Sequence, residues 1–173
     1  MPLFLDACAL AKRYLREQGS SRRMTEMMSR FDQWGGFVVS SFIELEVVSA
    51  LARFAREHPN YSVDLLQRHA YVVDQFRKDL SRAAFRIIWM NQDMLEEASE
   101  LLKRHPEYAI HAGDAVHLAT ALSARAGLDP GEQLVFVTAD RGLERAARAE
   151  GLPTLNPLHQ GTDLLEQMLH RSN

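Results

Sequence analysis

The 173-residue chain contains 46% hydrophobic and 25% charged residues, a composition that suits one globular α/β domain spanning residues 1–173. A single cysteine excludes an internal disulfide and a zinc site built on paired cysteines. The net charge of −3 argues against a module that binds nucleic acid by charge alone. Because neither a membrane-spanning stretch nor a secretory signal is visible, we expect a cytoplasmic protein with no membrane partner.

Short apolar runs alternate with longer helical patterns along the chain. We expect, in chain order, a strand at 2–5, helices at 7–17 and 22–34, a strand at 37–40, helices at 41–57 and 62–83, a strand at 85–90, helices at 92–104 and 111–126, a strand at 134–138, a helix at 141–150, a short fifth strand at 153–156 and a helix at 162–170. This order predicts a parallel sheet of four or five strands, covered by helices on both faces.

Two aspartates follow predicted strands and therefore lie at the carboxyl edge of the sheet, where open α/β sheets bind ligands. Asp6 comes directly after the first strand, and Asp140 comes two residues after the strand at 134–138. Each could equally cap the helix that follows, since aspartate is a favoured N-cap residue. Taken alone, either residue is better explained as a cap than as a ligand.

The segment SSFIELEVVSAL, residues 40–51, carries two glutamates into the helix that leaves the same edge. Ser41 and Glu44 have the spacing of a capping box, which predicts a structural role for Glu44. Glu46 has no such explanation, and the small residues Ser49 and Ala50 one turn later would leave room for a metal and a phosphate. A solvated glutamate on an amphipathic helix is the common alternative.

Asp114 is the most informative acid. Leu118, Ala121 and Leu122 follow it at helical spacing and place it in line with the face that points to the core. A buried carboxylate is costly unless it is paired or binds a metal. No Lys or Arg lies within one turn on this helix, so only a distant arginine remains as a structural partner.

The four acids are more informative together than singly. Carboxylates gathered at one edge would repel one another unless cations neutralised them. Oxygen ligands favour Mg²⁺ or Mn²⁺ over zinc. Such a site suits hydrolysis of a phosphodiester bond, because the cation can activate water and stabilise the leaving oxygen.

Four sequence blocks resemble the PIN-domain family, especially the VapC-like ribonuclease toxins of toxin–antitoxin pairs. The blocks are FLDACALAKRYLRE at 4–17, SSFIELEVVSAL at 40–51, GDAVHLATAL at 113–122 and FVTADRGLERAARAEGL at 136–152. They run in the family's order from residue 3 to about 156. Their registers align Asp6, Glu46, Asp114 and Asp140 with the family's acids, and Thr138 with a supporting hydroxyl.

The resemblance implies a PIN-like three-layer α/β/α sandwich and an endonuclease that depends on Mg²⁺ or Mn²⁺ and cleaves mostly RNA. It implies that the four acids bind metal or orient the attacking water. An antitoxin that blocks the site and a homodimer are the partners it suggests. Two departures stand out: Gly142 replaces a further acid or amide of some members, and residues 55–83 look like an added helical hairpin that could serve as a dimer surface, an antitoxin dock or an RNA-contacting arm.

Other residues and other functions also fit parts of the sequence. His117 lies one turn after Asp114 and fits a supporting or packing role, and Cys8 reads as a small packed residue. A basic cluster could contact RNA or form a solvated helical face; it comprises Arg13, Arg16, Arg22, Arg23 and Arg30. The alternatives are a catalytically silent scaffold that binds RNA or a protein, a DNA nuclease, and an aspartyl phosphatase, which would need a second aspartate where Cys8 stands.

Overall fold

The structure is a computed structural model that describes residues 1–15, 19–57, 65–81 and 85–171. A five-stranded parallel sheet forms its centre, in the order β3-β2-β1-β4-β5. The strands are β1 (Leu3–Leu5), β2 (Phe37–Ser40), β3 (Phe85–Ile88), β4 (Val135–Val137) and β5 (Thr154–Leu155). The helices are α1 (Ala7–Ala11), α2 (Ser20–Ser29), α3 (Ile43–Glu57), α4 (Leu65–Leu80), α5 (Gln92–Arg104), α6 (Ala112–Ala126), α7 (Arg141–Ala149) and α8 (Thr162–Arg171), with 3-10 turns η1 (Phe31–Gln33) and η3 (Pro106–Tyr108).

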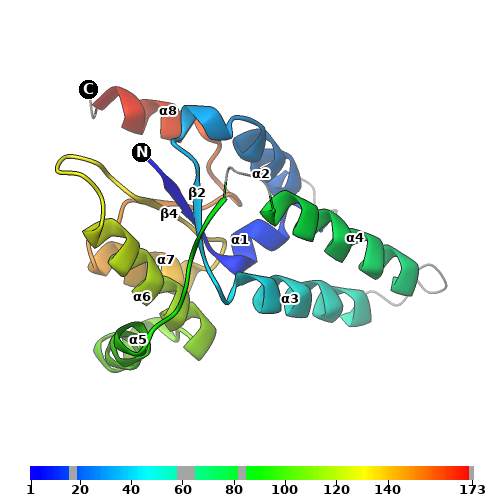
Figure 1. The fold of residues 1–173 in the computed structure, drawn as a ribbon, viewed down its shortest axis with the longest axis horizontal. Coiled ribbons are helices and arrows are strands. Elements are labelled where there is room, and N and C mark those ends of the chain that lie inside the picture. Colours follow the sequence, from blue (N-terminus) through cyan, green and yellow to red (C-terminus); the bar gives the residue numbers. More distant parts are fainter. Residues whose placement is uncertain (16–18, 58–64, 82–84, 172–173) are drawn as a thin grey trace.

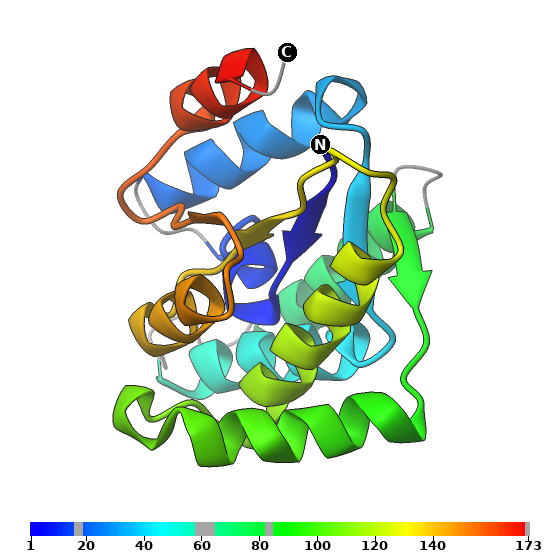
Figure 2. The same ribbon diagram turned by 90° about the vertical axis from the view of Figure 1, so that its left-hand side faces the viewer.

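Helices cover both faces of the sheet, as Figures 1 and 2 show. Alternate residues of one strand point to opposite faces. Leu3 and Leu5 therefore pack with α1, α2, α3, α4 and α8, whereas Phe4 packs with α5, α6 and α7. The Phe4 ring stacks on Phe136 of the neighbouring strand at 5.4 Å between centroids. The predicted three-layer α/β/α sandwich with a parallel sheet is thus confirmed, with five strands.

The strand order creates a switch point between β1 and β4. From β1 the chain winds outward through β2 to β3, and then returns to the other side of β1 to form β4 and β5. Ligands of open α/β sheets bind outside the carboxyl ends of the strands at such a point. Asp6 follows β1 and Asp140 follows β4, so the fold brings both to the switch point.

Most predicted elements are found, and the differences are local. The strand at 37–40 and the helix at 92–104 have the predicted bounds. The predicted helix at 7–17 is described as far as residue 15, and α1 ends at Ala11 because the amides of Lys12, Arg13 and Tyr14 each bond the third carbonyl back, which tightens the chain into turns.

The predicted helix at 22–34 starts earlier and breaks before its end. It begins at Ser20, ends at Ser29 and continues as the 3-10 turn η1. The break turns Trp34 back onto the helix, where its indole N–H donates to the Met27 carbonyl at 3.0 Å and its side chain is fully buried.

Within the described ranges, no helix is long and apolar enough to cross a membrane.

Helices α3 and α4 lie side by side and extend away from the sheet (Figure 1). Residues 58–64, between them, and residues 82–84 of the predicted 55–83 extension lie outside the described ranges. A buried ion pair connects α4 to the segment after α1: Asp79, 7% exposed, accepts from Arg13 Nε and from the Tyr14 hydroxyl, each at 2.9 Å. This contact places the C-terminal end of α4 beside the segment that follows α1, near the carboxyl edge of the sheet.

Candidate functional site

Two hydrogen bonds to its Oδ2 oxygen hold the side chain of Asp6 at the switch point. The residue is 1% exposed. The Thr138 hydroxyl donates to Oδ2 at 3.0 Å, and the Cys8 thiol donates to the same oxygen at 2.6 Å. The other oxygen, Oδ1, faces the imidazole of His117, with its Nε2 at 3.9 Å. One oxygen of Asp6 is therefore committed to the protein, while the second points into the site.

Asp140 lies on the opposite side of the switch point and caps α7. Its Oδ1 accepts from the Leu143 N–H at 2.8 Å, as a helix N-cap does. Its own N–H donates to Thr138 Oγ1 at 3.1 Å. Thr138 thus connects the backbone of Asp140 with the carboxylate of Asp6, in the supporting position that the sequence suggested. The Asp140 side chain is exposed, so its Oδ2 remains accessible.

Asp114 also combines a structural contact with a free oxygen. Its Oδ2 accepts from the His111 N–H at 2.8 Å, which caps the start of α6. Burial raises the pKa of the Asp114 carboxyl, the His111 N–H opposes this, and the nearby negative charges of Asp6 and Asp140 raise it further. The three aspartates are therefore close enough to repel one another, which is the situation that a cation relieves.

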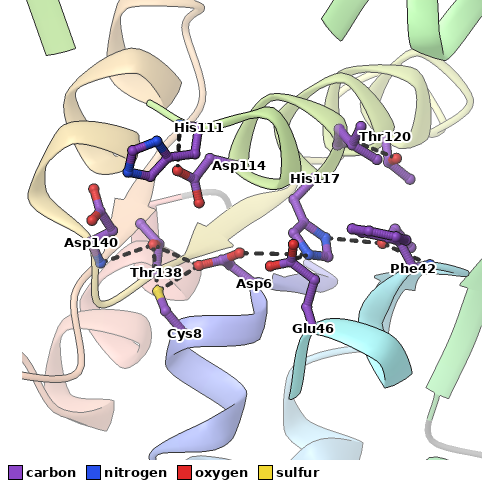
Figure 3. Close-up of polar contacts among 12 residues, drawn as sticks. Asp6, Cys8, Phe42, Glu46, His111, Asp114, His117, Thr120, Thr138 and Asp140 are labelled. Atoms are coloured by element: carbon purple, nitrogen blue, oxygen red, sulfur yellow. Dashed lines mark hydrogen bonds and ion pairs between the residues drawn. The ribbon is translucent and has the colours of Figure 1, made fainter. Parts of the chain in front are cut away.

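Glu46 completes the group from α3. Its side chain is 32% exposed, and its Oε2 lies 3.9 Å from His117 Nε2. Gly113 leaves the space that this carboxylate occupies: a β-carbon on Gly113 would lie 2.0 Å from Glu46 Oε1. Figure 3 shows Asp6, Glu46 and Asp114 directed toward one another, with Asp140 beside them. Sequence reasoning could not find that Gly113 makes room for Glu46, because that contact joins two helices far apart in the chain.

The imidazole of His117 is fully buried between the two acids and the sheet. Its Nδ1 lies 2.9 Å from Ser40 Oγ, at the end of β2. Its Nε2 is the only buried side-chain nitrogen or oxygen of the described residues that has no hydrogen-bond partner. That nitrogen faces Asp6 Oδ1 and Glu46 Oε2. The supporting role suggested for His117 is consistent with this position, and Ser40 is an additional residue that sequence reasoning did not find.

The geometry fits a hard cation in its donor types. Each aspartate uses one oxygen for the fold and keeps the other, and both Glu46 oxygens are without a protein hydrogen bond among the described residues. As the side chains stand, however, the described part of the chain holds no group of three His, Cys, Asp or Glu residues close enough to enclose a metal ion. Enclosing a cation therefore requires a side chain to move, and the partly exposed Glu46 carboxylate is the one that can turn toward Asp6.

Two sequence interpretations need correction. Helix α3 begins at Ile43, so Ser41 and Glu44 do not form the predicted capping box. Instead Ser41 Oγ accepts from the Met90 N–H at 3.2 Å, and Glu44 pairs with Arg77 Nε at 2.7 Å. Glu44 does have a structural partner, but that partner lies on α4.

Cys8 is not merely a packed residue. Besides its contact with Asp6, its sulfur accepts from the Ala139 N–H at 3.1 Å. Burial of the sulfur raises the pKa of the Cys8 thiol well above its ordinary value, and the Asp6 charge adds to this. The thiol is therefore neutral at physiological pH and serves as a hydrogen-bond donor to Asp6.

Most of the predicted basic cluster is engaged within the molecule. Arg13 pairs with Asp79, and Arg30 pairs with Glu26 and Glu166. Arg23 donates to the Leu158 carbonyl at 3.1 Å. Arg16 lies outside the described residues. These contacts favour the interpretation of a solvated helical face over an RNA-binding surface.

Gly142, which the sequence resemblance set against a further acid or amide, has no room for a side chain. A β-carbon at this position would lie 2.2 Å from the Tyr108 carbonyl oxygen of η3. A backbone carbonyl cannot turn away as a side chain can. Four acids are therefore the limit of this site.

The fold and the site define a three-layer α/β protein with an acidic cluster at the switch point of its parallel sheet. The profile of the PIN domain family matches residues 3–149, and the chain belongs to that family. No curated protein sequence matches the chain significantly.

Solved structures share the fold at low sequence identity. VapC20 of Mycobacterium tuberculosis, described as a toxin that cleaves the sarcin–ricin loop, is 18% identical over 90% of this chain and 99% of its own, with a TM-score of 0.63. VapBC2 of Rickettsia felis, bound to a fragment of its promoter DNA, is 14% identical over 90% and 98%, with a TM-score of 0.56. PAE2754 of Pyrobaculum aerophilum is 18% identical over 99% and 95%, with a TM-score of 0.54.

Proposed function

We propose that this PIN-domain protein is an endoribonuclease that depends on Mg²⁺ or Mn²⁺, and that it is the toxin of a toxin–antitoxin pair. The observation that carries the proposal is the gathering of Asp6, Glu46, Asp114 and Asp140 at the switch point. Each of the three aspartates keeps one oxygen to which no residue in the described part of the chain donates. A cluster of carboxylates with this mutual repulsion binds hard divalent cations.

The four acids would hold the cation in this proposal. When bound, it supplies a Lewis acid that activates water and stabilises the oxygen that leaves the phosphodiester. The protein's own residues prepare the ligands. Thr138 and Cys8 fix Asp6, the amides of His111 and Leu143 fix Asp114 and Asp140, and Glu46 keeps a movable side chain.

RNA as the substrate is supported by the family resemblance and by the description of VapC20 as a toxin that cleaves the sarcin–ricin loop. An antitoxin partner is supported by VapBC2, a structural neighbour that is a toxin–antitoxin complex bound to promoter DNA. A second such complex, FitAB bound to a DNA fragment, shares the fold at 17% identity with a TM-score of 0.53. We further propose that residues 1–173 act as one PIN-like domain, that the chain forms a homodimer, and that the 55–83 segment contributes a contact surface.

The test is cleavage of total cellular RNA and of a short single-stranded RNA, with Mn²⁺, Mg²⁺ or EDTA, by protein shown to be free of a co-purified inhibitor. Wild type should cleave with either cation and not with EDTA, and Asp6→Asn should be inactive. Glu44→Gln is the matched control, because Glu44 lies on the same helix as Glu46 but pairs with Arg77 at the surface. This control should cleave like wild type.

Two outcomes would contradict the proposal in different ways. Cleavage that persists in EDTA or in Asp6→Asn would show that the acids do not hold the catalytic cation. If wild type binds Mn²⁺ but cleaves no RNA under any condition, the protein is a metal-binding scaffold instead of a general ribonuclease.

A further inference from the structure

Helix α6 faces Glu46 with two residues that lie one turn apart, Gly113 and His117. Residues four apart on a helix occupy the same face. Gly113 supplies room for the Glu46 carboxylate, since a β-carbon there would lie 2.0 Å from Oε1. His117 supplies a nitrogen aimed at the same carboxylate, with Nε2 at 3.9 Å from Oε2. Together they form a cradle on α6 for a side chain that belongs to α3.

The hydrogen bonds around Ser40 indicate which imidazole nitrogen carries the proton. Ser40 Oγ accepts from the Phe42 N–H at 3.3 Å and lies 2.9 Å from Nδ1 of His117, a position from which its hydroxyl can donate to that nitrogen. A neutral imidazole that accepts at Nδ1 carries its proton on Nε2. The surroundings of Nε2 agree, because a lone pair directed at two carboxylates would be repelled, whereas an N–H is attracted.

We propose that His117 is a positioning residue, whose Nε2–H holds the Glu46 and Asp6 carboxylates together in the arrangement that receives the cation; this inference rests on the proposed function. Asp6 is fixed by Thr138 and Cys8, whereas Glu46 is partly exposed and can turn. The distance of 3.9 Å is about 1 Å longer than an ordinary N–H···O hydrogen bond, so a small rotation of Glu46 closes it.

Burial gives the contact its strength. The ring is fully buried, between Phe4 and Phe42, with centroids at 6.4 and 6.3 Å. A buried donor without a partner is costly to the folded protein, which therefore gains by drawing a carboxylate to Nε2. A ligand carboxylate supported in this way resembles the ligands of known metal sites, whose hydrogen-bonded partners set their orientation.

The first measurement determines the tautomer in the wild-type protein. Two-bond ¹H–¹⁵N correlation spectra of ¹⁵N-histidine-labelled protein distinguish a proton on Nε2 from one on Nδ1. We expect the Nε2–H form for His117, and a mixed population in Ser40→Ala. A wild-type ring with its proton on Nδ1 overturns the proposal whatever the variants do.

The second measurement is Mn²⁺ affinity, by electron paramagnetic resonance and calorimetry, without RNA. In His117→Gln the amide nitrogen reaches about as far as Nε2, whereas in His117→Asn it reaches only about as far as Nδ1. Loss of a supporting partner typically weakens metal binding by about 10–100-fold, which we expect for His117→Asn, while His117→Gln stays close to wild type.

A packing role predicts a different pattern, because both variants lose the ring and its contacts with Phe4 and Phe42 to a similar extent. Equal affinities in the two variants, either both retained or both lost with a lowered melting temperature, overturn the proposal. If wild type itself binds no Mn²⁺, the proposed function fails, and this inference fails with it. If wild type binds Mn²⁺ and affinity is lost only in His117 variants, the result bears on the role of His117 and leaves the proposed function standing.

Discussion

Replacing Gly113 by alanine should disturb the candidate site while leaving the fold intact. The new β-carbon would lie 2.0 Å from Glu46 Oε1, 2.8 Å from Cδ and 3.1 Å from Oε2, and the three nearest atoms all belong to this one side chain. Ordinary contact begins near 3.4 Å, so the Glu46 carboxylate must retreat by about 1.4 Å. Because Glu46 is a flexible and partly exposed side chain, it can yield without displacing the backbone.

The expected effects on stability and on the site have opposite signs. Gly113 lies in α6 and its φ is not positive, so alanine should add roughly 0.5–1 kcal/mol of helix stability. For a chain of this length, that amounts to a rise in Tm of about 1–4 °C. Metal ligands tolerate displacements of about 0.2 Å, and a misplacement of 1 Å at a catalytic centre can cost about 10²-fold in rate. RNA cleavage should therefore fall about 100-fold while the protein becomes no less stable.

Two other glycines provide the controls. A β-carbon on Gly127, at the other end of α6, meets only carbonyl oxygens at 3.7 and 4.0 Å, so Gly127→Ala should keep both activity and stability. One on Gly142 collides with the Tyr108 carbonyl at 2.2 Å, so Gly142→Ala should lower Tm. Thermal unfolding, Mn²⁺ titration and initial cleavage rates are measured for all three. Wild-type Mn²⁺ affinity and cleavage in Gly113→Ala would refute the position assigned to Glu46.

Three further predictions concern neighbouring contacts. Thr138→Val should weaken Mn²⁺ binding by about 10–100-fold, since it removes the hydroxyl that donates to Asp6 Oδ2. Thr138→Ser keeps that hydroxyl and should bind Mn²⁺ like wild type, which a Mn²⁺ titration of both variants measures. Asp79→Ala should cost about 3 kcal/mol in denaturant unfolding, because it strands Arg13 and the Tyr14 hydroxyl, whereas a loss below 1 kcal/mol would contradict a buried pair. The raised pKa of Asp114 means that the folded, metal-free protein binds this proton more tightly than the unfolded chain, so its stability falls as pH rises from the ordinary value through the raised one. Asp114→Asn should therefore raise Tm in EDTA at neutral pH, with no gain below the ordinary pKa, and an unchanged Tm at neutral pH would count against this linkage.

The sequence predicted the elements well because β1, β2, β4 and β5 are short buried runs, and because most of the helices carry an apolar stripe. The edge strand β3 is half-exposed and was recognised by its β-branched and aromatic residues. The order of the strands was not available from the sequence alone, although it determines the switch point. Alternation of strands and helices fits many parallel sheets; only the pairing of β1 with both β2 and β4 shows that Asp6 and Asp140 meet. Long-range contacts also explain why the predicted capping box at Ser41 was wrong: the partner of Ser41 is Met90, which follows β3.

For the acids, the sequence posed capping and ligation as alternatives, and the structure shows why that opposition is false. A carboxylate has two oxygens, and in Asp140 and Asp114 one of them caps a helix while the other stays available. The cap fixes the orientation of the remaining oxygen, so capping and the proposed ligation are compatible in one residue. Gly113 and Ser40 were not predicted, and the role of His117 stayed open between support and packing, since these residues have meaning only beside Glu46 and Asp6. A glycine signals nothing in a sequence until the carboxylate that fills its space is known.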